Sequence, residues 1–186
     1  SDAEKAINKL KRKKITQVKK LKFKFTPEDV APILRGLLSE NKDNKFILNF
    51  RKNNKLDYFI NGKHVNRYAN EGTATPDHVI RVKPFPLIIE PKENCSLEEF
   101  KKIAIKSFKN YRKKYINYFN ANKKKVKEKK TILDTSPRVI LVQNLGLFSV
   151  GSTLSATKIA GDLTETNASV ISSVEETTKY KFISKK

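Results

Sequence analysis

The sequence predicts a mixed fold, α/β or α+β, in which helices flank a central sheet that contains two hairpins. Apolar residues recur at helical spacing over 27–40 and 96–122, and each stretch begins beside a hydroxyl residue that can cap a helix. Short apolar runs of strand length flank turn residues over 46–60 and 138–150. Few strands among several helices favour a sheet under helical cover.

The composition is that of one folded domain. The chain has 186 residues, of which 38% are hydrophobic and 32% are charged. No apolar run approaches the roughly 20 residues that span a bilayer, so we expect no membrane partner. The first residues also lack the apolar stretch of a signal peptide. The single cysteine, Cys95, rules out an internal disulfide, and these features together predict a cytoplasmic protein.

The formal charge of +21 makes nucleic-acid binding one alternative function, because basic surfaces attract phosphate. Of the 40 basic residues, however, 33 are lysines spread through every segment and only seven are arginines. Proteins that read nucleic acids usually rely on arginine for bidentate and stacking contacts. We therefore favour a solvated, lysine-rich surface and expect nucleic acid to be an unlikely partner.

The amino-terminal residues 1–25 form a basic arm or linker. Lysines separate four apolar residues of weakly helical spacing: Ala6, Leu10, Ile15 and Leu21. Two interpretations stay open, namely a helix that packs on another part of a longer protein and an arm that frays. Residues 26–186 are predicted to form a single module.

The module opens with a helix over 27–40, because Thr26 can cap it and proline and two acidic residues follow. A hairpin is predicted next. Its first strand covers 46–50, its turn covers 51–55 and its returning strand covers 56–60. Asn61 and Gly62 are expected to close the hairpin, and residues 68–75 are predicted to form a loop that leads to a second, shorter helix-start signal.

That second signal begins at Pro76, but prolines a few residues later forbid a long helix. Residues 87–89 are predicted to form a buried strand. A long helix over 96–122 then opens with the capping box S-x-x-E. The charge run over 123–130 is expected to be solvated.

The last third predicts a second hairpin and a final helix. Residues 138–142 and 147–150 have the pattern of paired strands, and residues 143–146 have the composition of a tight turn. Either Ser152 or Thr153 is expected to cap the helix that follows.

Ten residues that end at Arg81 form the most unusual stretch, because they combine a glycine with hydroxyls, a carboxylate, an imidazole and a guanidinium. A short helix that starts here would direct free N–H groups at an anion. The candidate residues for binding a phosphate or carboxylate are Thr73, Thr75, Asp77, His78 and Arg81. The alternative is structural: Thr75 and Asp77 cap the helix, and Arg81 pairs with Asp77.

A complete metal site is not predicted. A catalytic zinc ion takes three protein ligands, whereas the only histidines are His64 and His78. His78 remains a possible single ligand, and His64 is expected in an exposed turn. The sequence also lacks a P-loop, a nucleophile elbow and a G-x-G-x-x-G fingerprint, so we expect no NAD bound to this chain in that mode.

Two segments resemble a known family, the bifunctional rhamnulose-1-phosphate aldolase/short-chain alcohol dehydrogenases. The first is GTATPDHVIRVKPFPLII over 72–89. The second is PRVILVQNLGLFSVG over 137–151, followed by KIAGD over 158–162. Both are similar to the later part of the class II aldolase/adducin-like region, and the resemblance covers roughly 26–180.

The resemblance implies a parent enzyme that cleaves a ketose 1-phosphate and oxidises the released aldehyde. It implies zinc held by histidines, NAD in a dehydrogenase region, and assembly into homo-oligomers. The family's H-x-H metal pair and acid/base glutamate have no counterpart here and are expected before residue 1, and the nucleotide fingerprint after residue 186. The chain is therefore expected to be a fragment, inactive alone, that contributes to a sugar-phosphate site or to domain assembly. The alternatives are a non-enzymatic adducin-like scaffold and a lysine-rich nucleic-acid-binding domain.

Overall fold

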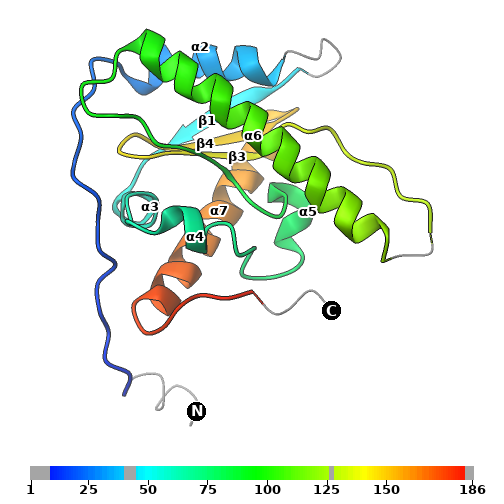
Figure 1. Cartoon of the computed structure of the whole chain (residues 1–186). Helices are drawn as coiled ribbons and strands as arrows, with labels where there is room; N and C mark the ends of the chain where they lie inside the picture. Colours follow the sequence, from blue (N-terminus) through cyan, green and yellow to red (C-terminus); the bar gives the residue numbers. More distant parts are fainter. Residues whose placement is uncertain (1–8, 40–44, 126–127, 183–186) are drawn as a thin grey trace.

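The computed structural model describes residues 9–39, 45–125 and 128–182 and contains a four-stranded mixed sheet with helices on both faces (Figure 1). The predicted class of fold is confirmed. The strand order is β1-β4-β3-β2, and the strands are β1 (Ile47–Arg51), β2 (Leu87–Ile89), β3 (Val139–Val142) and β4 (Gly146–Gly151).

The hairpin predicted in the last third is confirmed. Strands β3 and β4 pair antiparallel, with Ile140 opposite Phe148, and β2 lies parallel to β3 on the other side. The connecting turn contains Asn144 at φ 64°, a left-handed conformation that asparagine tolerates better than most residues. This hairpin forms the centre of the sheet.

The predicted hairpin over 46–60 is wrong, because its second half is the helix α3 (Asn54–Ile60). The side chain of Asn53 caps this helix by accepting a hydrogen bond of 2.9 Å from the Leu56 N–H. Apolar side chains at helical spacing then bury one face of α3: Leu56, Phe59 and Ile60. Strand β1 pairs antiparallel with β4 instead, far away in the sequence.

Both faces of the sheet are buried. Helices α2 (Pro27–Leu38) and α6 (Leu97–Lys123) cover one face, and α3, α4 (Val65–Tyr68) and α7 (Leu154–Glu175) cover the other; α5 (His78–Val82) packs against α7 (Figure 1). Side chains alternate along the central strand, since Phe148 lies in the core under α2 and α6 and Leu147 lies in the opposite core.

The helix starts follow the predicted capping chemistry. The Ser96 hydroxyl accepts from the Glu99 N–H at 3.2 Å, and the Glu99 carboxylate accepts from the Ser96 N–H at 2.8 Å. At α7 the cap is Thr153 rather than Ser152, and its hydroxyl accepts from the Ala156 N–H at 3.1 Å. Local sequence therefore sets where the long helices begin.

The basic arm lies extended along the module between residues 9 and 25, so a helix is wrong for this described part; Ala6 lies outside the described residues. Its backbone pairs with the turn after α3: the Val18 N–H donates to the Asn61 carbonyl, and the Lys63 N–H donates to the Thr16 carbonyl, both at 2.7 Å. Among the described residues, no helix has the length and apolar character needed to cross a bilayer.

Candidate functional site

Hydrogen bonds from two hydroxyl groups hold the loop before α5. The buried Thr73 hydroxyl donates to the Thr75 carbonyl at 2.7 Å, and the Tyr180 hydroxyl donates to the Thr73 carbonyl at 3.1 Å. Gly72 has φ +136°, which a residue with a side chain rarely adopts. The Thr73 hydroxyl therefore uses its one proton within the loop, while the Thr75 side chain is exposed.

His78 at the start of α5 is held by Asn167 of α7. The Asn167 Oδ1 accepts from the Ala74 N–H at 2.8 Å and lies 3.0 Å from His78 Nδ1. Because a backbone N–H only donates, the side-chain atom facing it must be the oxygen, and His78 Nδ1 must then carry the proton. In the neutral ring this leaves Nε2 as the acceptor.

The remaining predicted site residues, Asp77 and Arg81, are exposed. Asp77 precedes α5 without a side-chain capping bond, and in the described part of the chain it forms no ion pair with Arg81. The structural alternative predicted for these two residues is therefore wrong. The loop brings Thr73, Thr75 and His78 together, whereas Arg81 lines a separate pocket.

That pocket measures about 310 Å³ and lies where β4 ends and α7 begins. Charged residues from two other parts of the chain share it with Arg81. Asp134 and Arg138, which precede β3, line the same pocket, together with Ser152 between β4 and α7. The sequence did not predict this grouping, because more than fifty residues separate Arg81 from its charged neighbours.

Asp134 is bound on both oxygens by Arg138. One oxygen accepts from the guanidinium at 3.0 Å, the other accepts from its second nitrogen, and the Ser136 N–H donates to the first at 3.0 Å. Burial opposes ionisation of this carboxyl, but the hydrogen bonds from Arg138 and the charge of Lys83 outweigh it and hold the pKa of Asp134 below its ordinary value.

Lys83 approaches the same carboxylate from the interior, and sequence reasoning missed it. Its ammonium donates to the Asp134 carbonyl, lies 3.6 Å from Asp134 Oδ1 and sits 4.2 Å from the centre of the Tyr115 ring. Only 3% of Lys83 is exposed, and this burial lowers its pKa to about 8 although the Asp134 carboxylate opposes the shift.

The backbone of Lys83 is also unusual, with φ 63° and ψ 170°. This region is occupied almost only by glycine, so the surrounding structure must hold the residue there against strain. One signal was visible in the sequence, since Pro84 disfavours the helical conformation for the residue before it. Strain, burial and a lowered pKa in one lysine are features that cluster at functional sites.

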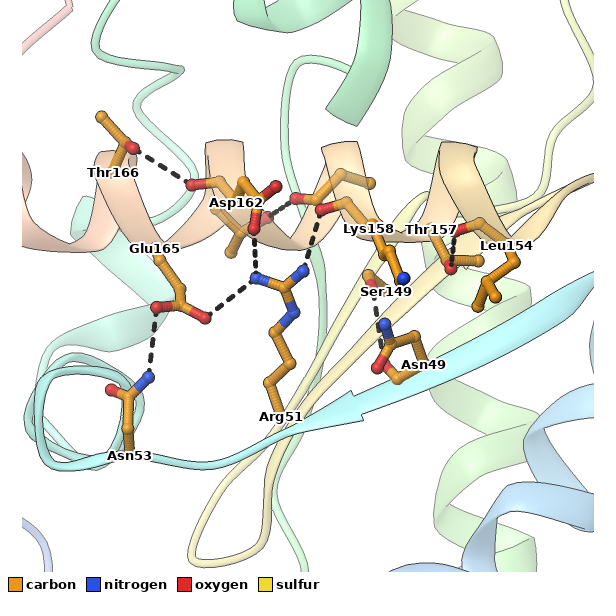
Figure 2. Close-up of polar contacts among 12 residues, drawn as sticks. Asn49, Arg51, Asn53, Ser149, Leu154, Thr157, Lys158, Asp162, Glu165 and Thr166 are labelled. Carbon is orange, nitrogen blue, oxygen red and sulfur yellow. Dashed lines mark hydrogen bonds and ion pairs between the residues drawn. The ribbon is translucent and has the colours of Figure 1, made fainter.

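The segment KIAGD over 158–162 has a structural role. Figure 2 shows Arg51 at the end of β1 pointing at α7, where its guanidinium donates to Asp162 at 2.6 Å and to Glu165 at 3.1 Å. It also donates to the Lys158 carbonyl at 3.0 Å. Gly161 leaves the space, because a Cβ there would lie 2.5 Å from Arg51 Cζ. These contacts join the edge strand to α7.

Replacing Arg51 with methionine should lower the free energy of unfolding by about 1–2 kcal/mol, because three charge-assisted or polar contacts to α7 are lost at a partly exposed position. Urea denaturation measures the difference. The exposed neighbour Lys52 offers a matched control, and Lys52→Met should stay within about 0.5 kcal/mol of the wild type. Equal effects of the two changes would refute a specific role for Arg51.

The described residues do not supply a complete metal site. No group of three histidine, cysteine or carboxylate side chains capable of holding a metal occurs in ranges 9–39, 45–125 and 128–182. His64 is exposed at the start of α4, as predicted, and Cys95 is buried. Zinc chemistry therefore does not fit these residues alone, and His78 offers a single ligand atom.

The four-stranded mixed sheet between its helical layers places the chain in the α/β class. The chain belongs to the family described as aldolase class II, second domain, whose family model matches residues 26–186. This confirms the class II aldolase part of the resemblance.

A particular relative is the protein named "Uncharacterized oxidoreductase YuxG" of Bacillus subtilis (strain 168). The two are 30% identical over 137 residues, which cover 72% of this chain, and the chain spans only 19% of the length of that relative. No solved structure matches the chain.

Proposed function

We propose that this chain is the second aldolase module of a longer, two-activity enzyme that cleaves a sugar phosphate and oxidises the aldehyde product. Its contribution is to place His78 at a sugar-phosphate site that other polypeptide completes. Family membership supports the aldolase part, and the similarity to a protein named as an oxidoreductase supports the second activity. Zinc, NAD and assembly into oligomers belong to this proposal as properties of the longer enzyme, and rhamnulose 1-phosphate is its proposed substrate.

The observation that carries the proposal is the contact between His78 and Asn167. A histidine whose Nδ1–H is held by a carbonyl oxygen presents Nε2 in one orientation, as acceptors and ligands in catalytic sites require. Asn167 is itself anchored by the loop backbone through Ala74. A half-buried histidine with one free acceptor nitrogen can accept a hydrogen bond from a substrate hydroxyl.

Nitrogen NMR on the isolated chain at alkaline pH should find the proton of neutral His78 on Nδ1, because Asn167 Oδ1 can only accept. In Asn167→Leu the ring should become a mixture of both tautomers, while exposed His64 serves as an internal reference. A proton on Nε2 of His78 in the wild type would contradict the arrangement.

The activity itself is tested in the longer enzyme by measuring aldehyde release from rhamnulose 1-phosphate with added zinc. His78→Ala should lower the rate of cleavage about a hundredfold or more, the range typical of lost acid–base or ligand groups, and leave aldehyde oxidation unchanged. His64→Ala, at the exposed start of α4, is the matched control and should be silent. Full cleavage activity in His78→Ala would end the proposed role.

A further inference from the structure

The pocket between α5 and the start of α7 is lined by more cationic than anionic side chains. Its lining includes two guanidinium groups, Arg81 and Arg138, and one carboxylate, Asp134. Lys83 adds a third cation behind that carboxylate. Three cationic side chains therefore stand against one carboxylate in and beside a space of about 310 Å³.

The one carboxylate in this group is held mainly by Arg138. Both oxygens of Asp134 already accept hydrogen bonds from Arg138, and one also accepts from the Ser136 N–H. The guanidinium of Arg138 uses three of its five N–H groups on Asp134 and the Ser136 carbonyl, which leaves two. Asp134 therefore fixes the orientation of Arg138, and both of its oxygens already accept hydrogen bonds.

Arg81 is the second guanidinium group of the pocket, and no acceptor in the described part of the chain binds it. It lies on α5, is exposed, and has no hydrogen-bond or ion-pair partner among the residues that the structure describes. All five of its N–H groups are therefore available to a ligand. Two guanidinium groups from separate elements around one space match the planar, forked geometry with which arginine binds phosphate oxygens.

The rest of the lining agrees with an anion. Exposed Ser152 contributes a hydroxyl, and the first turn of α7, which begins at Leu154, contains no acidic residue that would compete for its free N–H groups. Lys83 does not line the pocket, but its buried ammonium lies 3.6 Å from the Asp134 carboxylate.

We propose that this pocket binds a phosphate monoester dianion, with Arg81 and Arg138 as the recognising residues. Arg81 lies one helical turn from His78 on α5, so the pocket is adjacent to the sugar-phosphate site suggested above. The physiological ligand rests on the proposed function, whereas binding of the dianion does not. The proposed anion site therefore includes Arg81 but not the two threonines of the preceding loop.

The test titrates this chain with inorganic phosphate, glycerol 3-phosphate and neutral glycerol at constant ionic strength, followed by proton–nitrogen NMR. Saturable shifts are expected at Arg81 Nε and at the amides of 152–154 with both phosphates, and none with glycerol. Tighter binding of glycerol 3-phosphate would assign the pocket to a phosphorylated metabolite, and equal binding would assign it to the phosphoryl group alone. No saturable shift at these positions would overturn the proposal.

Three variants separate specific binding from the general attraction of a chain with charge +21. Arg81→Gln should weaken phosphate binding about tenfold or more, the effect of losing a charge-assisted contact. Arg35→Gln removes the same charge from an exposed arginine beside a different groove on α2 and should bind like the wild type. Equal losses of phosphate affinity in Arg81→Gln and Arg35→Gln would show that net charge alone explains the binding, and would overturn the proposal.

Ser152→Asp is a variant that should lose phosphate binding while it stays folded. A carboxylate just before the capping residue Thr153 should stabilise α7 slightly while it repels the ligand. The expected result is an unchanged or raised melting temperature with binding weakened about tenfold or more; unchanged binding would count against the pocket. Dianion binding without sugar-phosphate cleavage in the longer enzyme would leave this inference standing and end the proposed function.

Discussion

Replacing Phe148 with alanine should lower the free energy of unfolding by about 3–5 kcal/mol, the largest effect of a single substitution expected here. Phe148 is 1% exposed on β4, the strand that pairs with both β1 and β3. Its ring lies 5.0 Å from the ring of Phe50, centre to centre. Alanine would lose this contact and leave a cavity that the paired strands on either side cannot close.

Guanidinium denaturation measures the change, and a constant slope with denaturant would show that the folded and unfolded states are otherwise comparable. Phe148→Leu should cost distinctly less, because more of the volume is kept. Ile105→Ala on α6 is the surface control; this side chain is 46% exposed, so the change should be within about 1 kcal/mol. A loss below 1 kcal/mol in Phe148→Ala would mean that β4 is not the centre of the core.

The stability of the protein should rise by about 2 kcal/mol between pH 8 and pH 10 through Lys83 alone. Burial lowers the pKa of Lys83 to about 8 from an ordinary value of 10.5. Between these values the unfolded chain holds a proton that the folded chain has released, so raising the pH favours folding. The gain is complete above about 10.5 and is lost as the pH falls to 8.

The difference between the wild type and Lys83→Met isolates this effect, because methionine meets the same backbone strain without a charge. Urea denaturation at a series of pH values should show the rise in the wild type and none from this position in the variant. Above about pH 10 both proteins should lose stability, since burial raises the pKa of Tyr68 and Tyr111 and the unfolded phenols ionise first. Parallel curves for the two proteins would refute the burial of the charged group.

Local chemistry explains which elements the sequence predicted. The capping box at Ser96 and the threonine before α2 are read within four residues, and both mark true helix starts. The hairpin over 46–60 failed because its apolar run suits a strand and a helix alike, and Asn53 suits a turn and a cap alike. Two tertiary contacts decide between strand and helix: α3 packs against α7, and β1 pairs with β4. Neither contact can be read from the local sequence.

The candidate site could be predicted from the sequence even less completely than the fold. His78 was predicted from its own loop, but Asn167, which orients it, lies 89 residues away. Lys83 and Asp134 are separated by 51 residues, and neither stood out in its own segment. Arg81 was predicted as an anion contact together with the threonines, whereas the structure places it in a different pocket. Residues that act together across the fold need the tertiary structure to be recognised.

The pairing of β1 with β4 has a consequence for how the chain folds. Hairpin β3–β4 and helix α7 are contiguous in sequence, so they can assemble first as a nucleus. Strand β1 must then close a loop of about a hundred residues before it pairs and before Arg51 reaches α7. We expect refolding to be slow for a domain of this size, with the β1 edge acquiring protection from hydrogen exchange last.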